Sequence, residues 1–472
     1  MTLFTGKELQ ELLKGYVSFP ELSHGSILPD ISEISTDSRK KSCSSLFIAL
    51  DGERFDAHDF IASAVENGSV LVCADIKKKE KVPAGVPAFF VDSPLKFYQY
   101  LANCHRKRFK DLFLIALTGS CGKTSTKEAL RAIFCEYAGR DKVLATEGNT
   151  NNQIGVAQNL FRLTGEHKFA IIEMGTNHFG EILPLAEMAL PDAAMVVSIG
   201  SCHLEYLKNF EGVATEKGEI FSRLGQEGIC VIPANCPAVE LLREKAEKRT
   251  KNIYTFGEND PKASVSFSYL GGDMDGSSFA LSFPGGGKET IHWALSGKHQ
   301  AQNAAASAAM ALACKVPPEV IKKGLANTVL PGMRMKKSFY NGAVFLNDSY
   351  NANPDSMKAS IAFLAEFAKK DKTILVLGDM GEIGENSLRE HMKVLSYASD
   401  LFPASKIICV GKMMRQACDV ISLLSRKENM VSYVDVTEAR PHVLEEAKEG
   451  VLLFLKASHF MQFYKLDPSS GE

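Results

Sequence analysis

The sequence predicts an α/β protein of three domains. They are a small N-terminal α/β module, a central P-loop domain with a parallel sheet and an antiparallel patch, and a C-terminal Rossmann-like α/β domain. The chain has 472 residues, and single cores stop growing near ~250 to 300 residues. From about residue 111 strand-like apolar runs alternate with helical segments, as in a parallel sheet covered on both faces. We expect domains at 1–110, 111–329 and 330–472.

The N-terminal module is predicted from short apolar runs separated by helical segments. The runs are "SLFIAL" (45–50), "SVLVCA" (69–74) and "PAFFVD" (87–92), and "DFIASAVENG" has a helical pattern. This order indicates a small α/β fold.

The central region repeats strand and helix more regularly. "LFLIALTG", "FAIIEMG", "AAMVVSIG" and "GICVIP" read as strands of a parallel sheet, with helices between them. Residues 252–296 instead alternate around Gly-Asp turns, which predicts an appended antiparallel patch. The small-residue run 304–314 is expected to be a buried helix.

The third region follows the linker-like segment "VLPGMRMK" (329–336). Its strand candidates are "AVFLNDSY", "TILVLGDMG", "KIICVG" and "GVLLFLKAS". They again predict a mostly parallel α/β domain.

Composition narrows the class of partner. Lys plus Arg (54) nearly balances Asp plus Glu (56), which argues against nucleic acid or an anionic membrane and favours a small-molecule substrate. The eleven cysteines contain no CxxC pair, as suits a reducing compartment. No signal peptide is visible, and no run reaches the ~18 apolar residues of a membrane span. We expect a cytoplasmic protein.

A glycine-rich loop carries the strongest chemical signal. In "ALTGSCGKTSTKE" (116–128), only Ser120 and Cys121 separate Gly119 from the Gly122-Lys123-Thr124 group, so the loop is shorter than the common P-loop. Its backbone N–H groups, with Lys123 and Ser125, could hold terminal phosphates, and the Thr124 hydroxyl could bind Mg²⁺. The alternative is a chance glycine loop.

Two further candidates lie at strand ends. Glu173 ends an apolar strand and could complete a Mg²⁺ shell at the carboxyl edge of the sheet, or it could be a solvent-facing strand end. His203 follows the next strand, and isolated histidines are usually structural. Thr124, Glu173 and His203 at three consecutive strand ends indicate a shared site.

Other candidates have open alternatives. Lys217, on a helix, could equally be a solvated charge. The polar loop 346–357, which contains Asp348, could bind a ribose, position a domain, or be only a well-bonded turn. Asn303 could read an adenine edge or cap a helix.

The motifs together resemble those of the Mur ligase family, over most of the chain. The resemblance is carried by "TGSCGKTSTKE", "EGNTNNQIGVAQNL", "EMGTNHFGEI", "HLEYL", "ATEKGEIF", "GKHQAQNAAAS", "PGMRM" and "NDSYNANPDSM…LGDMGEIG". The short phosphate loop is that family's form. "ISTDSRK" and "SLFIALDGERFDAHDF" look like its N-terminal UDP-binding module.

The resemblance implies an ATP-dependent, ADP-forming amide ligase. ATP would convert a carboxylate into an acyl phosphate, and an amine would then displace phosphate. By the same likeness Thr124, Glu173 and His203 would ligate Mg²⁺, and a carbamylated Lys217 would hold a second Mg²⁺. Asn303, Arg334 and Asp348 would contact adenine, phosphate and ribose.

Smaller features favour the family member that adds D-Ala-D-Ala to UDP-N-acetylmuramoyl-tripeptide for bacterial peptidoglycan. The expected substrate-binding residues are Ser38, Arg39, Asn149, Asn151, Asn152, Tyr350, Asn351 and Asn353. The sequence departs from the family at Ala157 and Gln158, and at Ala457 and His459. A related ligase with another acceptor amine, such as a folylpolyglutamate synthase-like enzyme, and a regulatory nucleotide-binding protein are the alternatives. We expect a monomer.

Overall fold

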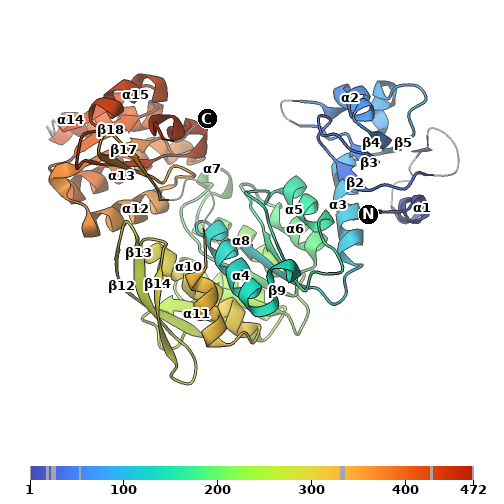
Figure 1. Ribbon diagram of the computed structural model, residues 1–472, viewed down its shortest axis with the longest axis horizontal. Coiled ribbons are helices and arrows are strands. Elements are labelled where there is room, and N and C mark those ends of the chain that lie inside the picture. Colours follow the sequence, from blue (N-terminus) through green and yellow to red (C-terminus); the bar gives the residue numbers. More distant parts are fainter. Residues whose placement is uncertain are drawn as a thin grey trace. The chain divides into compact units, whose positions relative to one another are not determined.

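The structure is a computed structural model, and it describes residues 2–16, 21–22, 28–52, 55–329, 335–425 and 429–469. Its contacts divide the chain into two compact units (Figure 1). The first unit comprises Met1–Asp111, Thr150–Gly165 and Glu187–Leu190, and the second comprises the rest of the chain. All eleven cysteines are free thiols in the structure.

The first unit contains a five-stranded sheet in the order β1-β5-β4-β3-β2. Its strands are β1 (Glu21–Leu22), β2 (Glu33–Ser35), β3 (Ser45–Ile48), β4 (Ser69–Asp75) and β5 (Ala88–Val91). Only β1 pairs antiparallel with its neighbour. The three predicted strands of this module are confirmed.

Four α-helices accompany this sheet: α1 (Gly6–Gly15), α2 (Ile61–Glu66), α3 (Pro94–Arg106) and α5 (Gln153–Phe161). Local sequence explains where two of them start. Thr5 and Glu8 form a reciprocal capping box at α1, and Ser93 caps α3 ahead of Pro94. Helix α5 packs against α3 within this unit.

The second unit contains a nine-stranded sheet in the order β14-β13-β12-β11-β10-β9-β6-β8-β7. Its strands are β6 (Phe113–Thr118), β7 (Val143–Ala145), β8 (Phe169–Glu173), β9 (Ala193–Val196), β10 (Ile229–Pro233), β11 (Asn252–Glu258), β12 (Val265–Asp273), β13 (Gly276–Ser282) and β14 (Lys288–Trp293). Strand β6 pairs in parallel with both β8 and β9. This order sets the phosphate loop between the two strand ends that were expected to supply metal ligands.

The antiparallel patch is confirmed, with one correction. Strand β11 continues the parallel sheet from β10, and β12 also pairs with it in parallel. Only the β12-β13-β14 portion, yellow-green in Figure 1, is antiparallel. Alternation of polar and apolar residues cannot distinguish these cases, because it reports which face is buried and not the direction of the neighbouring strand.

The helices of this part of the chain are α4 (Lys123–Ala138), α6 (Ile182–Ala189), α7 (Leu204–Leu207), α8 (Phe210–Gly218), α9 (Val239–Glu247), α10 (Lys298–Ala313) and α11 (Pro318–Ala326). Helix α4, which begins at the phosphate loop, packs against α10 and α11. The alanines of α10 are buried, which confirms the expected buried helix. Small side chains allow α10 to lie close both to α4 and to strands β11 and β12.

A six-stranded sheet follows, in the order β15-β16-β20-β17-β18-β19. Its strands are β15 (Lys336–Tyr340), β16 (Ala343–Asn347), β17 (Thr373–Gly378), β18 (Lys406–Val410), β19 (Met430–Tyr433) and β20 (Leu452–Lys456). All pairs are parallel except β15 with β16. The expected C-terminal α/β fold is confirmed.

Helices cover both faces of this third sheet: α12 (Pro354–Phe367), α13 (Ser387–Leu401), α14 (Lys412–Ser425) and α15 (Val436–Glu445). One buried cluster joins Met357, Val394 and Met414 of the first three helices to Leu375 of β17. A second cluster joins Val443 of α15 to the opposite face. Burial on both faces explains the continuous apolar runs of the strands.

The fold class is therefore as the sequence predicted. The expected boundaries after residues 110 and 329 remain predictions, and most of the linker segment lies outside the described residues. In the described part of the chain, no helix has the combined length and apolarity needed to span a membrane.

Candidate active site

The phosphate loop joins β6 to α4. Gly122 precedes the first residue of α4 and has a left-handed φ of +81°. The positive φ favours glycine here, and because a Cβ on Gly122 would lie 2.2 Å from Asn303 Oδ1, any other residue would displace the Asn303 side chain. No side chain caps α4, and its first backbone N–H groups are left for an anion.

Ser198, just after β9, holds the loop in shape. Its hydroxyl accepts a hydrogen bond from Cys121 N at 2.9 Å and donates one to Cys121 O at 2.8 Å. The Ser198 carbonyl accepts from Ser120 N at 2.9 Å. Lys123 Nζ donates to Gly119 O at 2.7 Å, within the loop itself. Hydrogen bonds within the protein thus shape the loop, and Thr124 and Ser125 are buried.

Glu173 is the last residue of β8 and is 1% exposed, so the alternative of a solvent-facing strand end is wrong. Its register partner on β6 is Leu117, one residue before the strand ends at Thr118. Glu173 N donates to Thr146 Oγ1 at 2.9 Å. The carboxylate therefore originates beside the start of the phosphate loop.

His203 follows β9 and precedes α7, with a left-handed φ of +51°. Its Nδ1 lies 2.5 Å from Glu382 Oε2. Because a carboxylate only accepts, Nδ1 is the donor. Burial lowers the pKa of His203, which favours the neutral imidazole that binds metal ions.

Lys217 is fully buried in α8, so the alternative of a solvated surface lysine is wrong. Burial lowers the pKa of its amine to about 8, and Lys123 of the phosphate loop acts in the same direction. Among the described residues, Lys217 Nζ has no hydrogen-bond partner. A buried amine without a partner is costly, which indicates that it has a ligand or a modification in the working protein.

The sequence did not single out Glu216, which is also buried. Its carboxylate accepts hydrogen bonds from Gly180 N at 2.7 Å, Glu181 N at 2.9 Å and Ile182 N at 2.7 Å, at the start of α6. A carboxylate at a helix N-terminus is favoured by the helix dipole. Glu216 thereby fixes α8 and, with it, the position of Lys217.

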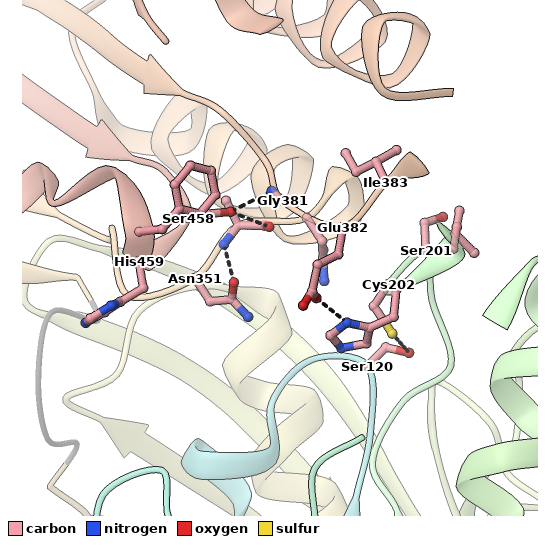
Figure 2. Close-up of a pocket in the computed structure, with 14 residues that line it drawn as sticks. Ser120, Ser201, Cys202, Asn351, Gly381, Glu382, Ile383, Ser458 and His459 are labelled. Carbon is pink, nitrogen blue, oxygen red and sulfur yellow. Dashed lines mark hydrogen bonds and ion pairs between the residues drawn. The ribbon is translucent and has the colours of Figure 1, made fainter. Parts of the chain in front are cut away.

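A cavity of about 200 Å³ lies beside His203 and the phosphate-loop residue Ser120 (Figure 2). It is lined by Ser120, Ser201, Cys202, His203, Leu204, Asn351, Ala352, Asn353, Gly381, Glu382, Ile383, Ser458, His459 and Phe460. Figure 2 shows Ser120, Ser201 and Cys202 on one side and Gly381, Glu382, Ser458 and His459 on the other. Loops of the second and third sheets therefore form one polar site.

The expected nucleotide contacts outside the loop have mixed outcomes. Asn303 lies within α10, which begins at Lys298, so it is not a helix cap; its Nδ2 donates to Gln300 Oε1 at 3.0 Å. The Asp348 carboxylate already pairs with Lys456 Nζ at 2.6 Å and accepts from Ser360 Oγ at 2.7 Å. Arg334 lies outside the described residues.

Two expected substrate contacts of the polar loop line the cavity, namely Asn351 and Asn353. Asn353 is also the N-cap of α12, and its Nδ2 contacts Cys121 Sγ at 3.1 Å. The ring of Tyr350 lies edge-on to His459, with centroids 5.8 Å apart. Asn353 therefore carries structural bonds that the sequence did not reveal.

The remaining expected substrate residues are divided between the units. In the first unit Ser38 lies in a turn, and exposed Arg39 pairs with Asp37 at 2.8 Å. Asn152 caps α5 by accepting from Ile154 N and Gly155 N, and Asn151 precedes it. Asn149 is exposed in the second unit. Asn152 therefore stabilises the start of α5, in addition to any contact that it makes with substrate.

A separate acidic group in the first unit is paired with lysines. Within the residues described, one group of three His, Cys, Asp or Glu side chains has its possible ligand atoms within 4.8 Å of one another. It consists of Asp51, Asp56 and His58. Lys78 and Lys81 pair with Asp56 at 2.9 and 2.7 Å. These two cations already neutralise the carboxylates.

The donor set near the phosphate loop does suit Mg²⁺. Thr124 and Glu173 offer a hydroxyl and a carboxylate, the oxygen donors that Mg²⁺ prefers, and His203 offers an imidazole nitrogen. Within the described ranges the Lys217 amine has no hydrogen-bond partner, so this buried group could accommodate a further anionic ligand. The residues therefore fit a metal-nucleotide site.

Comparison with known proteins identifies the class. Residues 117–311 match the Mur ligase middle domain, and residues 333–459 match the Mur ligase glutamate ligase domain. A curated ligase from Escherichia coli K12 is 34% identical over 413 residues, which are 87% of each chain. The chain belongs to the Mur ligase family.

Within that family, the similarity is to one kind of member. The Escherichia coli relative is UDP-N-acetylmuramoyl-tripeptide--D-alanyl-D-alanine ligase. A ligase of the same name from Bacillus subtilis 168 is 30% identical over 464 residues, covering 98% of this chain and 97% of its own. A crystal structure of MurF from Acinetobacter baumannii has a TM-score of 0.87 and 29% identity, with 98% of both chains covered.

Proposed function

We propose that this protein joins D-Ala-D-Ala to UDP-N-acetylmuramoyl-tripeptide with conversion of ATP to ADP and phosphate. The observation that carries the proposal is the similarity to ligases of that name along 87% of both chains. The phosphate loop, the polar cavity lined by Ser120 and His203, and the buried Lys217 support the proposal.

In the proposed reaction, a carboxylate oxygen of the tripeptide attacks the γ-phosphorus of ATP. The bond to the β,γ-bridging oxygen breaks, and ADP leaves with that electron pair. The amine of D-Ala-D-Ala then attacks the acyl carbon, phosphate leaves, and the nitrogen loses a proton. Catalysis of both steps depends mainly on positioning and on stabilising negative charge.

The phosphate loop binds and orients the nucleotide in this proposal. Gly119, Ser120, Cys121, Gly122 and Lys123 would surround the β- and γ-phosphates, with Thr124 and Ser125 at the first turn of α4. Because Ser120 N and Cys121 N already donate to Ser198, the backbone N–H groups at the start of α4 would supply the phosphate contacts. Lys123 leaves its contact with Gly119 O and neutralises charge on the transferring phosphoryl group. A flexible ammonium can make that move at the cost of one hydrogen bond.

Mg²⁺ would be held by Thr124, Glu173 and His203, and when bound it neutralises phosphate charge. We propose that Lys217 is carbamylated and holds a second Mg²⁺ through its new carboxylate. The support is its pKa of about 8, because a neutral amine is the form that combines with CO₂. Carbamylation would also replace an uncompensated buried cation by a metal-bound anion.

The other expected contacts keep their roles as proposals. Asn303, Arg334 and Asp348 would contact adenine, phosphate and ribose, respectively. The sugar-peptide contacts would come from the following residues: Ser38, Arg39, Asn149, Asn151, Asn152, Tyr350, Asn351 and Asn353. We also propose a monomer in the bacterial cytoplasm, where ATP is available.

The test is phosphate release from ATP with UDP-N-acetylmuramoyl-tripeptide, comparing D-Ala-D-Ala, single amino acids and no amine. We expect release that requires D-Ala-D-Ala and yields the UDP-pentapeptide, measured by mass. Release that requires another amine would move the chain to a sister ligase. Release that ignores both substrates would contradict the ligase function.

A further inference from the structure

The contact between His203 and Glu382 joins two distant parts of the chain. His203 follows a strand of the nine-stranded sheet, and Glu382 follows β17 of the six-stranded sheet. Nδ1 donates to Oε2 at 2.5 Å. In the described part of the chain, the other ring nitrogen, Nε2, makes no hydrogen bond, so its lone pair is available as a ligand.

Glu382 also contacts the loop that follows Glu173. Its second oxygen, Oε1, accepts from Asn177 Nδ2 at a long 3.4 Å. One carboxylate therefore touches both the loop that follows Glu173 at the end of β8 and the loop after β9 that contains His203. In Figure 2 a dashed line marks the contact between the Glu382 carboxylate and the imidazole of His203.

The backbone on both sides of the contact is strained. His203 has φ of +51° and Glu382 has φ of +58°, and neither is glycine. Such conformations persist where the surroundings enforce them, and they cluster at functional sites. Contacts on either side of Glu382 hold its loop in place. Gly381 N donates to Ser458 Oγ at 3.0 Å, and Gly384 packs so closely that a Cβ on it would lie 2.9 Å from Glu205 Cα.

We propose that Glu382 is a positioning residue of the metal site, which holds the His203 imidazole so that Nε2 faces the metal-nucleotide. This inference rests on the proposed function. A carboxylate bonded to the far nitrogen of a ligating histidine fixes its tautomer and orientation and makes the ligand more basic. Because Glu382 comes from the third sheet, the full metal site exists only when its loop lies against the loops after β8 and β9.

The test uses Mn²⁺ as the probe, with ADP and the full chain. Mn²⁺ affinity is measured from the EPR signal of the free ion for wild type and Glu382→Gln. We expect Glu382→Gln to weaken Mn²⁺ binding by ~10- to 100-fold, the usual effect of losing such a partner. Glu385→Gln is the matched control, since it removes the same charge from an exposed residue three positions away and should leave Mn²⁺ affinity unchanged.

A double-mutant cycle separates positioning from a general loss of charge. In a His203→Ala background, Glu382→Gln should have no further effect on Mn²⁺ affinity, because Glu382 acts through the imidazole. Unchanged affinity in Glu382→Gln, or the same loss with and without His203, would overturn the inference. Glu382→Ala, with its fold checked by thermal melting, removes the hydrogen bond as well and should weaken Mn²⁺ binding at least as much.

The binding assay contains neither the sugar-peptide nor the amine. A wild-type protein that makes no UDP-pentapeptide would contradict the proposed function without changing the expected Mn²⁺ affinities. Normal Mn²⁺ affinity in Glu382→Gln would reject the role of Glu382 while leaving ligation intact. The two failures are therefore distinguishable.

Discussion

Glu216 and Lys217 are neighbours in α8 and both are buried, yet only Glu216 is hydrogen-bonded. Its carboxylate accepts from three backbone N–H groups at the start of α6, whereas Lys217 Nζ has no hydrogen-bond partner within the described residues. The carboxylate thus has a fold role, and the amine has none. A buried amine that makes no stabilising contact in the fold is typical of a functional group.

Lys217→Ala should abolish ligation, and a short-chain carboxylic acid should restore part of it. The reason is that the free acid can occupy the cavity left by the side chain and replace the proposed carbamate. Product formation is measured with and without added acetate. Lys322→Ala, which removes an exposed lysine of α11 paired with Glu289, should be active and insensitive to acetate. Full activity of Lys217→Ala without any additive would exclude the carbamate.

Lys217 should also make stability depend on pH. Its pKa is about 8 in the folded protein against an ordinary 10.5. Between these values the unfolded chain holds the proton and the folded chain does not, so stability rises with pH over that window. Relative to Lys217→Met, wild type should gain roughly 3 kcal/mol in unfolding free energy from pH 7 to pH 11.

This pH dependence is measured by urea unfolding in CO₂-free buffer, where the amine stays unmodified. Lys322→Met is the control, since an exposed lysine should give no difference from wild type with pH. A wild type and a Lys217→Met variant whose stabilities follow parallel pH curves would show that the amine is not buried in the free protein.

Lys123→Ala should reduce the rate of ligation by ~100-fold or more, which is a barrier increase of roughly 3 kcal/mol. The physical reason is loss of the cation that neutralises the transferring phosphoryl group. Initial rates are measured at saturating ATP, so that weaker nucleotide binding does not account for the effect. Near-normal turnover would remove Lys123 from the reaction.

Glu173→Ala and His203→Ala should each raise the Mg²⁺ concentration needed for half-maximal activity by at least ~10-fold. Each variant removes one donor from the proposed metal shell. The measurement is activity against Mg²⁺ concentration at constant free ATP. A lower rate with an unchanged Mg²⁺ titration would make the residue structural and not a ligand.

Gly122→Ala should weaken ADP binding by at least ~10-fold, whereas Gly139→Ala should not. Both glycines have left-handed φ, +81° and +97°, so either change costs ~1 to 3 kcal/mol of stability. They differ in the room available for a side chain. A Cβ at Gly122 would lie 2.2 Å from Asn303 Oδ1, whereas a Cβ at Gly139 would have no atom within 4 Å. Calorimetry with ADP measures both affinities, and equal affinities would refute the tight contact at the loop.

Local patterns predicted the strands and helices well. The apolar runs at 113–118, 169–173 and 193–196 are strands, and the glycine loop does lie between β6 and α4. The strand direction in residues 252–296 could not be predicted, because register and neighbour direction arise from pairing between distant segments. The sequence could predict that Glu173 and His203 lie at the same edge of the sheet. Alternation of strands and helices along the chain implies parallel strands, and the carboxyl ends of parallel strands lie at one edge.

The sequence by itself determined the α/β class, the short phosphate loop and the family motifs, because these depend on residue periodicity and on spacing within one segment. Only the tertiary structure decided that Lys217 is buried, that Asn303 is no cap, and that Glu382 lies against His203 from 179 residues away. Burial, pKa and long-range contacts are properties of the packed chain, since they depend on which distant segments exclude water from a group.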